Sequence, residues 1–273
     1  MTKSVFIDGE AGTTGLEIRE RLAGVNGLSV VSIAPEKRKD LDARRALMEQ
    51  ADLVVLCLPD DAAKDAVALA ASLGSKAPRI VDASTAHRLA NGWVYGFAEL
   101  DAEQAGRIRS ADKVANPGCY PTGAIALLRP LVEAGIVPKD HPLTVNAVSG
   151  YSGGGRQMIE TYEPKRTAPN FELYALGLEH KHVPELMAYI GLTRRPIFVP
   201  SVGNFRQGML VSIPLHLDTL PGKPSLGDIE GALVKHYAGA KSVRVVTDAT
   251  AKMQRLEPEA LNGNRVPSLH HRD

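Results

Sequence analysis

The sequence has few cysteines and no excess of charge of one sign. Only two cysteines, Cys57 and Cys119, occur among 273 residues, and they lie far apart. They form neither a disulfide framework nor a spacing typical of zinc ligands, so we expect a protein of a reducing compartment, the cytoplasm. The 32 basic and 31 acidic residues leave a net charge of +1, which gives no electrostatic basis for binding nucleic acid.

The sequence also has no long apolar run, and we expect no secretory signal. No segment approaches the roughly 20 apolar residues that a membrane helix needs, so we expect no membrane partner. Residues 1–8 lead directly into a strand-like pattern, without the basic and apolar regions of a signal peptide. The composition, 44% hydrophobic and 23% charged, is that of a globular chain, and 273 residues suit one large domain or two ordinary ones.

The N-terminal half alternates short apolar runs with helical patterns. The strand-like runs are residues 4–8, 28–33, 51–60 and 79–84, and the helical patterns are residues 16–22 and 62–73. Nearly continuous apolar runs are typical of parallel strands that are buried on both faces. We therefore expect an α/β fold that begins with a Rossmann-type parallel sheet over residues 1–117.

The pattern changes after Asn116. The sequence NPGCYPTG places turn residues before a helix that we expect to start near Pro121 or Thr122. Strand-like runs follow in LTVNAVSG, IFVPSVGNF and QGMLVSIPLHL, and LGDIEGALVKHYAG has a helical pattern. We expect an α+β catalytic domain with a mixed sheet over residues 118–261, followed by an atypical tail over residues 262–273.

A glycine-rich turn, GEAGTTG, joins the first strand to the first helix. Gly9, Gly12 and Gly15 would let the backbone turn tightly and approach a pyrophosphate, which helix N-terminal amides favour. The spacing is not the strict G-x-G-x-x-G, so the motif alone also fits an ordinary strand–helix turn. In its βαβ context it predicts a nucleotide site that includes Thr13 and Thr14.

The second strand indicates which nucleotide binds. NAD-binding units usually carry an acid about 20 residues past the glycines, on the ribose hydroxyl, but this strand ends near Ser32. Arg38 follows among other cations. A hydroxyl with cations suits a 2′-phosphate, although Glu36 argues against this and a solvated turn is the alternative. We therefore predict NADP as the cofactor, with Pro59 and Ser84 at later strand ends as further contacts.

The two cysteines have different sequence surroundings. Cys57 lies inside the apolar run VVLCL, where a buried, inert thiol is expected. Cys119 lies among turn residues just before a helix, and a helix N-terminus lowers a thiol pKa from about 8.5 into the range of about 3.5–7.5. Cys119 is therefore a candidate nucleophile, with a structural cysteine in a turn as the alternative.

Two histidines and two acids are grouped in EHKHVPE. A histidine near a thiolate serves as a general base and then as an acid, and a carboxylate such as Glu185 could fix its tautomer. His180 and His182 share a side only in extended chain. A zinc site or plain surface polarity are the alternatives, but without a matching cysteine or histidine cluster we predict no metal.

The segment SGYSGGGR offers hydroxyls, amides and one arginine. Such a loop can bind an anion or a carboxylate, and a flexible turn is the alternative. We take Ser149, Gly150 and Arg156 as candidate substrate-binding residues, together with Asn116 near the cysteine.

Taken together, these motifs resemble those of a known family. GEAGTTG, LCLPDDA, DASTAHR, ANPGCYPTGA, AVSGYSGGGR and EHKHVPE closely resemble the N-acetyl-γ-glutamyl-phosphate reductases of arginine biosynthesis, in their shorter bacterial form. PGCYPTGA is highly specific among them. The resemblance implies a Rossmann NADP domain, an α+β catalytic domain and a homo-oligomer. It implies that Cys119 is the nucleophile and that His180, His182 and Glu185 belong to the catalytic motif, without saying which histidine takes the proton.

The resemblance also implies a two-stage reaction on an acyl phosphate. The Cys119 thiolate displaces phosphate from N-acetyl-γ-glutamyl phosphate, and NADPH reduces the thioester to N-acetylglutamate 5-semialdehyde while a histidine stabilises the oxyanion. Arg156 is the candidate for a substrate carboxylate or phosphate. The alternatives are an aspartate-semialdehyde dehydrogenase-like enzyme, against which HKHVPE argues, an inactive nucleotide-binding protein, and a metalloprotein that uses Cys119 with the two histidines.

The C-terminus departs from the family pattern. Similar proteins continue past the point that matches Ala260 and Leu261 with a further strand and a long Gly/Ala-rich helix that packs on the nucleotide domain. Residues 262–273, NGNRVPSLHHRD, are polar and lack that pattern. We expect from this an exposed apolar face on the nucleotide domain, lower stability and a weaker nicotinamide pocket.

Overall fold

The computed structural model describes residues 2–247 and 268–270, and the chain divides into two compact units. The first unit comprises Met1–Phe97 and Ala105–Pro117, and the second comprises Ala98–Gln104 and Gly118–Asp273. The segment Ala98–Gln104 thus groups with the second unit although it precedes residue 117. Most of the predicted atypical tail, residues 262–273, lies outside the described residues.

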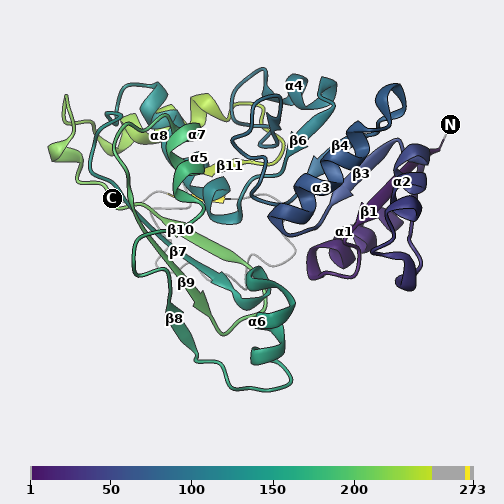
Figure 1. Ribbon diagram of the computed structural model, residues 1–273. Helices are drawn as coiled ribbons and strands as arrows, with labels where there is room; N and C mark the ends of the chain where they lie inside the picture. Colours follow the sequence, from purple (N-terminus) through teal and green to yellow (C-terminus); the bar gives the residue numbers. More distant parts are fainter. Residues whose placement is uncertain (1, 248–267, 271–273) are drawn as a thin grey trace. The chain divides into compact units, whose positions relative to one another are not determined.

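A six-stranded parallel sheet forms the centre of the first unit (Figure 1). Its strands are β1 (Lys3–Asp8), β2 (Leu28–Val31), β3 (Leu53–Leu56), β4 (Arg79–Asp82), β5 (Val94–Tyr95) and β6 (Lys113–Ala115). They lie in the order β2-β1-β3-β4-β6-β5, and every adjacent pair is parallel. The order changes direction beside β1, which is where open α/β sheets bind their ligands. The predicted Rossmann-type parallel sheet is confirmed.

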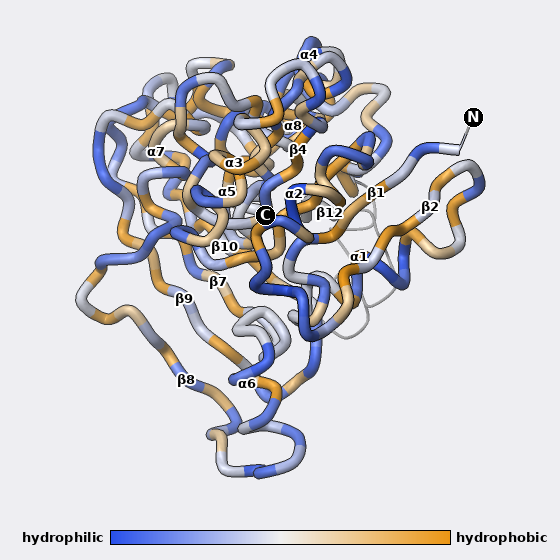
Figure 2. The backbone as a smooth tube through the Cα atoms, turned by 45° about the vertical axis from the view of Figure 1, so that its right-hand side comes forward, coloured by the Kyte–Doolittle hydropathy of each residue, from blue (hydrophilic) through white to orange (hydrophobic). Residues whose placement is uncertain are grey.

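Strands β1 and β3 are buried on both faces, as their continuous apolar runs predict, whereas β2 at the edge of the sheet is only partly buried. Phe6 packs in one core cluster with Met48 and Leu56, whereas its neighbour Ile7 packs in a second cluster with Val55. Figure 2 shows β1 as a hydrophobic segment. The helices of the unit are α1 (Thr13–Ala23), α2 (Leu41–Gln50), α3 (Asp60–Ala71) and most of α4 (Gln104–Ser110), with short 3-10 turns at Pro35–Lys37 and Gly74–Lys76.

A buried ion pair joins α2 to the end of β1. Arg44 donates hydrogen bonds from Nε and Nη2 to Asp8 Oδ2 over 3.1 and 2.6 Å, and the two side chains are 11% and 5% exposed. Removing one partner leaves the other charge buried and uncompensated. We expect Arg44→Met to lower the free energy of unfolding by about 3 kcal/mol in urea titrations. The exposed neighbour Arg45 is the matched control, and an equal loss in Arg45→Met would contradict this account.

A four-stranded mixed sheet forms the centre of the second unit (Figure 1). Its strands, in the order β10-β7-β9-β8, are β10 (Met209–Ser212), β7 (Thr144–Gly150), β9 (Ile197–Gly203) and β8 (Phe171–Leu173). The central pair is parallel and the two outer pairs are antiparallel. The predicted α+β region with a mixed sheet is confirmed.

Helix α5 (Cys119–Glu133) packs against β10 and against two other helices, α7 (Val183–Ile190) and α8 (Leu226–His236). A Cβ at Gly123 would lie 2.8 Å from the Val211 side chain, so this glycine lets α5 approach β10 closely. The remaining elements are α6 (Gly155–Tyr162), the 3-10 turns Tyr151–Gly154 and Leu217–Thr219, and the parallel pair β11 (Arg244–Val246) and β12 (Ser268–His270).

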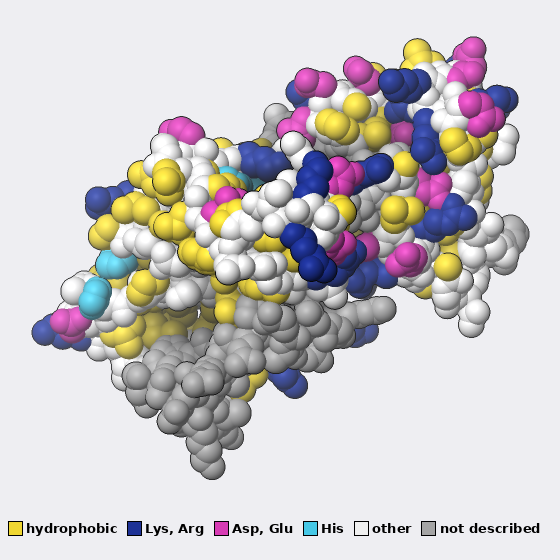
Figure 3. Space-filling view, turned by 90° about the horizontal axis from the view of Figure 1, so that it is seen from below, with side chains coloured by type: hydrophobic (Ala, Val, Ile, Leu, Met, Phe, Trp, Pro, Cys, Tyr) yellow, Lys and Arg dark blue, Asp and Glu magenta, His cyan; other side chains and the backbone are white. Residues whose placement is uncertain are grey.

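The surface carries charges of both signs. Figure 3 shows Lys and Arg side chains interspersed with Asp and Glu on the face in view, in line with the net charge of +1. Among the described helices, none combines the length and the apolar character required to cross a membrane. Leu16, Val25, Leu41 and Leu89 are exposed on the first unit. The apolar face expected there stays a prediction.

Candidate active site

The glycine turn follows β1 and passes directly into α1. Gly9 has a φ of +92°, and a Cβ there would lie 2.3 Å from a backbone carbonyl oxygen just after β3. A Cβ at Gly15 would lie 2.6 Å from the Gly9 carbonyl oxygen, so both positions require glycine. Gly12 is the N-cap of α1 and supplies no side-chain cap to the first turn, which Thr13 and Thr14 begin. Amides arranged in this way suit an anion such as pyrophosphate.

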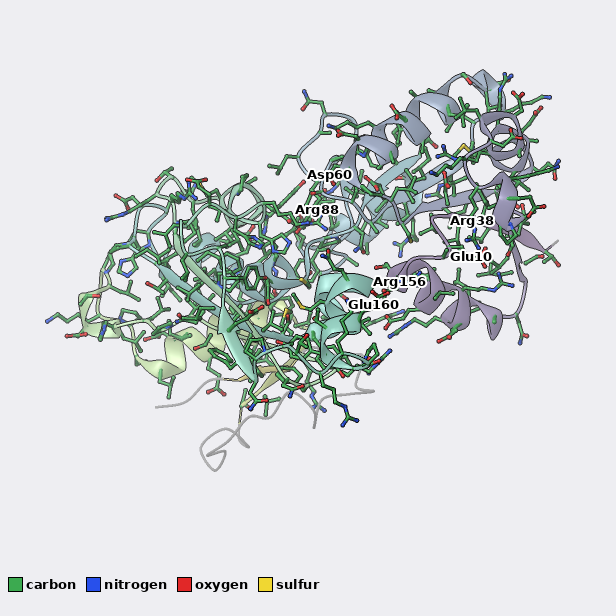
Figure 4. All side chains as sticks on the ribbon, turned by 60° about the horizontal axis from the view of Figure 1, so that its bottom comes forward. Glu10, Arg38, Asp60, Arg88, Arg156 and Glu160 are labelled. Atoms are coloured by element: carbon green, nitrogen blue, oxygen red, sulfur yellow. The ribbon has the colours of Figure 1, made fainter. Side chains whose placement is uncertain are left out.

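Three side chains meet just past the end of β2. Ser32 Oγ lies 2.6 Å from Arg19 Nη1 of α1 and 3.1 Å from Glu10 Oε1 of the glycine turn. The Arg19 guanidinium also forms an ion pair with the Glu10 carboxylate. The hydroxyl predicted to meet the nucleotide is therefore already in contact with an acid and a cation. Arg38 follows the turn Pro35–Lys37 and is exposed (Figure 4).

A buried carboxylate organises the loop after β4. Asp82 is fully buried and accepts hydrogen bonds from the hydroxyl of Ser84 at 2.6 Å and from its amide at 2.9 Å. His87 Nδ1 lies 2.6 Å from the same carboxylate, and the His87 ring stacks on Trp93. The Ser84 hydroxyl hydrogen is thus used within the loop, and its contact with the cofactor stays a prediction.

The same loop is bonded to neighbouring segments. The amide and hydroxyl of Thr85 donate to Asp60 Oδ1, at 2.9 and 2.8 Å, in the first turn of α3, whose N-cap is Pro59. Arg88 Nε donates to the carbonyl of Asn116 at 3.0 Å. Figure 4 labels Asp60 and Arg88. Pro59 and Asn116 follow the carboxyl ends of β3 and β6, the sheet edge where ligands bind in this type of fold. Their contacts with ligands stay predictions.

Cys119 is the first residue of α5, and its side chain is exposed. The helix therefore begins earlier than the start expected near Pro121 or Thr122. Gly118 is the N-cap, and the Thr122 hydroxyl donates to the Gly118 carbonyl at 2.8 Å. An earlier start places the sulfur at the positive end of the helix dipole, where negative charge is stabilised.

Cys57 differs from Cys119 in its surroundings. It is half-buried just after β3, near the acids Asp8 and Asp82. Burial, followed by the charges of these two carboxylates, raises the pKa of Cys57 to about 11. A thiol that stays protonated at neutral pH is a poor nucleophile.

The carboxylate of Glu185 holds the backbone immediately before Cys119. Its Oε1 accepts the Gly118 amide at 2.7 Å, and Glu185 is 1% exposed. The expected role of this carboxylate in fixing a histidine tautomer stays a prediction. Glu185 lies in the first turn of α7, so it ties the start of α5 to a second helix.

His180 and His182 lie just before α7, with ring centroids 4.6 Å apart. His180 Nδ1 accepts the backbone amide of His182 at 3.1 Å, so the neutral His180 ring carries its proton on Nε2. Burial, and then the charge of Lys181, lowers the pKa of His180 below its ordinary value of 6.5. His182 is buried and packs edge-on against Tyr120. His180 is therefore the half-buried ring that offers an Nε2–H donor at neutral pH.

The lowered pKa of His180 gives the folding stability a pH dependence. The unfolded chain binds a proton at His180 more readily than the folded protein does. The contribution of neutral His180 to the free energy of unfolding is therefore fully present above pH 6.5, and it is lost as the pH falls through the pKa of the folded state. We expect the free energy of unfolding of His180→Gln to depend less steeply on pH than that of the wild type between about pH 7 and pH 5. The exposed His216 provides the control, and a His180→Gln slope as steep as that of His216→Gln would overturn the prediction.

Tyr120 connects the residue after the candidate nucleophile with the end of β7. Its hydroxyl lies 2.8 Å from Ser149 Oγ and 2.9 Å from the carbonyl oxygen of Ser201. Burial raises the pKa of Tyr120, which keeps the phenol protonated and able to donate. Ser149 therefore lies in the same unit as Cys119 and is linked to it through one side chain.

Gly150 and Arg156 lie at the two ends of the glycine-rich segment. A Cβ at Gly150 would lie 2.6 Å from the backbone of Arg206 and Gln207, so glycine is required there for packing. Arg156 on α6 pairs with Glu160 at 2.9 Å, and its side chain is 79% exposed (Figure 4). The contacts of both residues with substrate stay predictions.

Sequence reasoning missed several members of these clusters. Glu10 and Asp82 lie inside the motifs GEAGTTG and DASTAHR. Asp82 is the last residue of β4, and an acid at the end of a buried strand was the available signal for it, whereas Glu10 lies in the turn after β1. Nothing in the sequence marked Arg19 as a site residue except its place one helical turn after Gly15. Among the described residues, no group of three or more His, Cys, Asp or Glu side chains is arranged to hold a metal ion.

Two family models match the chain. The model described as "Semialdehyde dehydrogenase, NAD binding domain" matches residues 19–108. The model described as "Semialdehyde dehydrogenase, dimerisation domain" matches residues 119–266 and begins at Cys119. The first match therefore lies mostly in the first unit, and the second match lies in the second unit.

Named relatives match nearly the whole chain. The N-acetyl-gamma-glutamyl-phosphate reductase of Rhizobium meliloti is 53% identical over 275 residues, which cover 98% of this chain and 88% of the relative. The protein of the same name from Brucella ovis is 53% identical over 268 residues, which cover 96% of this chain and 86% of the relative.

Solved structures share the fold at low sequence identity. Aspartate semialdehyde dehydrogenase from Francisella tularensis has a TM-score of 0.64 at 14% identity, over 98% of this chain and 89% of that one. The enzyme from Candida albicans, solved with NADP, has a TM-score of 0.59 at 14% identity, over 95% and 85%. These similarities show the fold alone. Because its identity to the named relatives is 53% over nearly its full length, the chain belongs to the N-acetyl-γ-glutamyl-phosphate reductase family.

Proposed function

We propose that this chain uses NADPH to reduce N-acetyl-γ-glutamyl phosphate to N-acetylglutamate 5-semialdehyde and phosphate, through a thioester at Cys119. The observation that carries the proposal is the exposed thiol at the first residue of α5, directly after an amide held by buried Glu185. Membership of the family supports the substrate, and it places the reaction in arginine biosynthesis.

The first stage transfers the acyl group to the protein. The Cys119 thiolate attacks the acyl carbonyl carbon, a C–S bond forms, and the C–O bond breaks so that phosphate leaves with its electron pair. The bond between Glu185 and the Gly118 amide fixes the backbone that carries the sulfur. A fixed backbone supports a near-attack position, which lowers the entropic part of the barrier.

The second stage reduces the thioester. NADPH, when bound, supplies the hydride that the carbonyl carbon accepts. The negative charge that develops on the carbonyl oxygen needs a donor, and the Nε2–H of neutral His180 supports that role. Collapse of the thiohemiacetal releases the aldehyde and restores the Cys119 thiolate. We assign the donor role to His180 because His182 is buried against Tyr120.

The residues of the first unit suit the binding of NADP. The glycine turn leads into a helix start without a side-chain cap, which suits the pyrophosphate. Ser32 and Arg38 lie after β2, where the 2′-phosphate is expected. In the second unit, Ser149 and Arg156 are the proposed contacts of the substrate.

The assembly and the location of the protein are also part of the proposal. The match to a dimerisation domain supports a homo-oligomer. A biosynthetic reductase that draws on NADPH is expected in the cytoplasm. Light scattering of the purified protein and cell fractionation would test these two points.

The reverse reaction provides the test of function. The protein is mixed with N-acetylglutamate 5-semialdehyde, phosphate and NADP⁺, and NADPH absorbance is followed, with aspartate semialdehyde in a parallel reaction. We expect kcat/KM to favour the first substrate by at least about a hundredfold. A preference for aspartate semialdehyde would instead indicate the related dehydrogenase activity. NADP⁺ binding without turnover of either substrate would indicate an inactive nucleotide-binding protein.

A further inference from the structure

Arg19 lies where folds of this type recognise the adenosine ribose. Ser32 follows β2, and the end of the second strand is the position that reads the ribose 2′ substituent. Arg19 Nη1 lies 2.6 Å from Ser32 Oγ. Arg19 belongs to α1, the helix that begins at the glycine turn, so its guanidinium links this helix to the end of β2.

Glu10 is the second charged group at this strand end. An acid there is typical of NAD enzymes, in which it accepts the ribose hydroxyl. Here the Glu10 carboxylate is already engaged by the Arg19 guanidinium, and it lies 3.1 Å from the Ser32 hydroxyl. The Glu10 side chain is 10% exposed, against 47% for Arg19. The acid is therefore the inner partner, and the cation is the group that an incoming ligand meets.

We propose that Arg19 is a specificity-determining residue for NADP, held at the end of β2 by Glu10. The inference rests on the proposed use of NADP. A guanidinium carries five N–H donors, more than its contacts with Glu10 and Ser32 require, so donors remain for the oxygens of a 2′-phosphate. Because Glu10 fixes the guanidinium before nucleotide binds, less side-chain freedom is lost on binding.

The same arrangement predicts an asymmetric effect of losing Arg19. The 2′-hydroxyl of NAD carries no charge, so the cation contributes little to its binding. The 2′-phosphate of NADP loses a charge-assisted contact and also faces the Glu10 carboxylate without its counter-ion. Loss of Arg19 therefore weakens NADP far more than NAD.

The test compares two ligands that differ only in the 2′-phosphate. Isothermal titration calorimetry measures the affinities of the whole protein for 2′,5′-ADP and for 5′-AMP. We expect Arg19→Met to weaken 2′,5′-ADP by about ten- to a hundredfold and to change 5′-AMP by less than about threefold. Arg21→Met is the matched control, since Arg21 is exposed on the same helix and the charge change is identical.

Two further variants distinguish the role of the Arg19 guanidinium from a folding defect. Arg19→Lys retains the charge without the planar fork and should give an intermediate loss, even if Arg19→Met folds poorly. Arg19→Met combined with Glu10→Gln should recover several-fold of the lost 2′,5′-ADP affinity, because the uncompensated carboxylate is gone. If the Arg19 variants kept the wild-type ratio of the two affinities, whether or not both ligands bound more weakly, the role of Arg19 would be wrong while the use of NADP could still hold. A wild-type protein that prefers 5′-AMP would contradict the use of NADP itself.

Discussion

Replacing Cys119 with serine is expected to lower kcat for the reduction of N-acetyl-γ-glutamyl phosphate by about a thousandfold or more. Serine keeps the size of the side chain at the first residue of α5, but its hydroxyl does not ionise near neutral pH, so the acyl group is not transferred. Affinity for NADPH should stay within about threefold, because the glycine turn belongs to the other unit. Steady-state kinetics and NADPH titration measure the two effects separately.

Cys57→Ser is the control for this prediction. Cys57 is half-buried, and its raised pKa of about 11 keeps it protonated, so we expect the variant to retain most of the wild-type kcat. If Cys119→Ser kept more than about a tenth of the wild-type rate, the covalent route would be wrong.

Replacing Glu185 with alanine is expected to affect both stability and rate. The Gly118 amide would lose its acceptor in a buried position, and the side chain that is 1% exposed would leave a cavity. Together these effects should lower the free energy of unfolding by about 3 kcal/mol. The looser start of α5 should lower kcat by about a hundredfold, with a smaller change in KM, because Cys119 is no longer held in place.

Glu185→Gln distinguishes a positioning role from proton transfer. Glutamine keeps a carbonyl oxygen that can accept the Gly118 amide, so we expect kcat within about tenfold of wild type and a nearly normal unfolding curve. If the carboxylate itself moved protons, Glu185→Gln would lower kcat as much as Glu185→Ala does. Equal rates for the two variants would therefore contradict the positioning role.

The sequence predicted β1 and β3 well because these strands are largely buried on both faces. Continuous apolar runs led directly to β1, β3 and β4, which the sheet order confirms. The short strands β5 and β6 were not predicted, since two or three residues are too few for a recognisable apolar run. Helix α2 was missed because its apolar side is short: only Met48 is buried, and Ala43 and Leu47 pack partly buried against the same core. Its start is set by Asp40, whose carboxylate accepts the amides of Asp42 and Ala43, and such a cap is only evident once a helix is suspected.

The candidate site was predictable where a motif carries its own chemistry. Cys119 was found because turn residues precede a helix, but the exact helix start depends on the Gly118 cap. The partner of Glu185 could not be predicted, since Gly118 lies 67 residues away and the contact forms only when α5 packs on α7. The cluster of Arg19 with Glu10 and Ser32 likewise joins three separate elements.

Peptide mass spectrometry of the protein mixed with N-acetyl-γ-glutamyl phosphate in the absence of NADPH tests the thioester most directly. One acyl group per chain should appear on the peptide that contains Cys119, with release of one phosphate, and addition of NADPH should remove the acyl group and yield the aldehyde. Full reductase turnover without acylation of Cys119, or with the acyl group on another residue, would contradict the account.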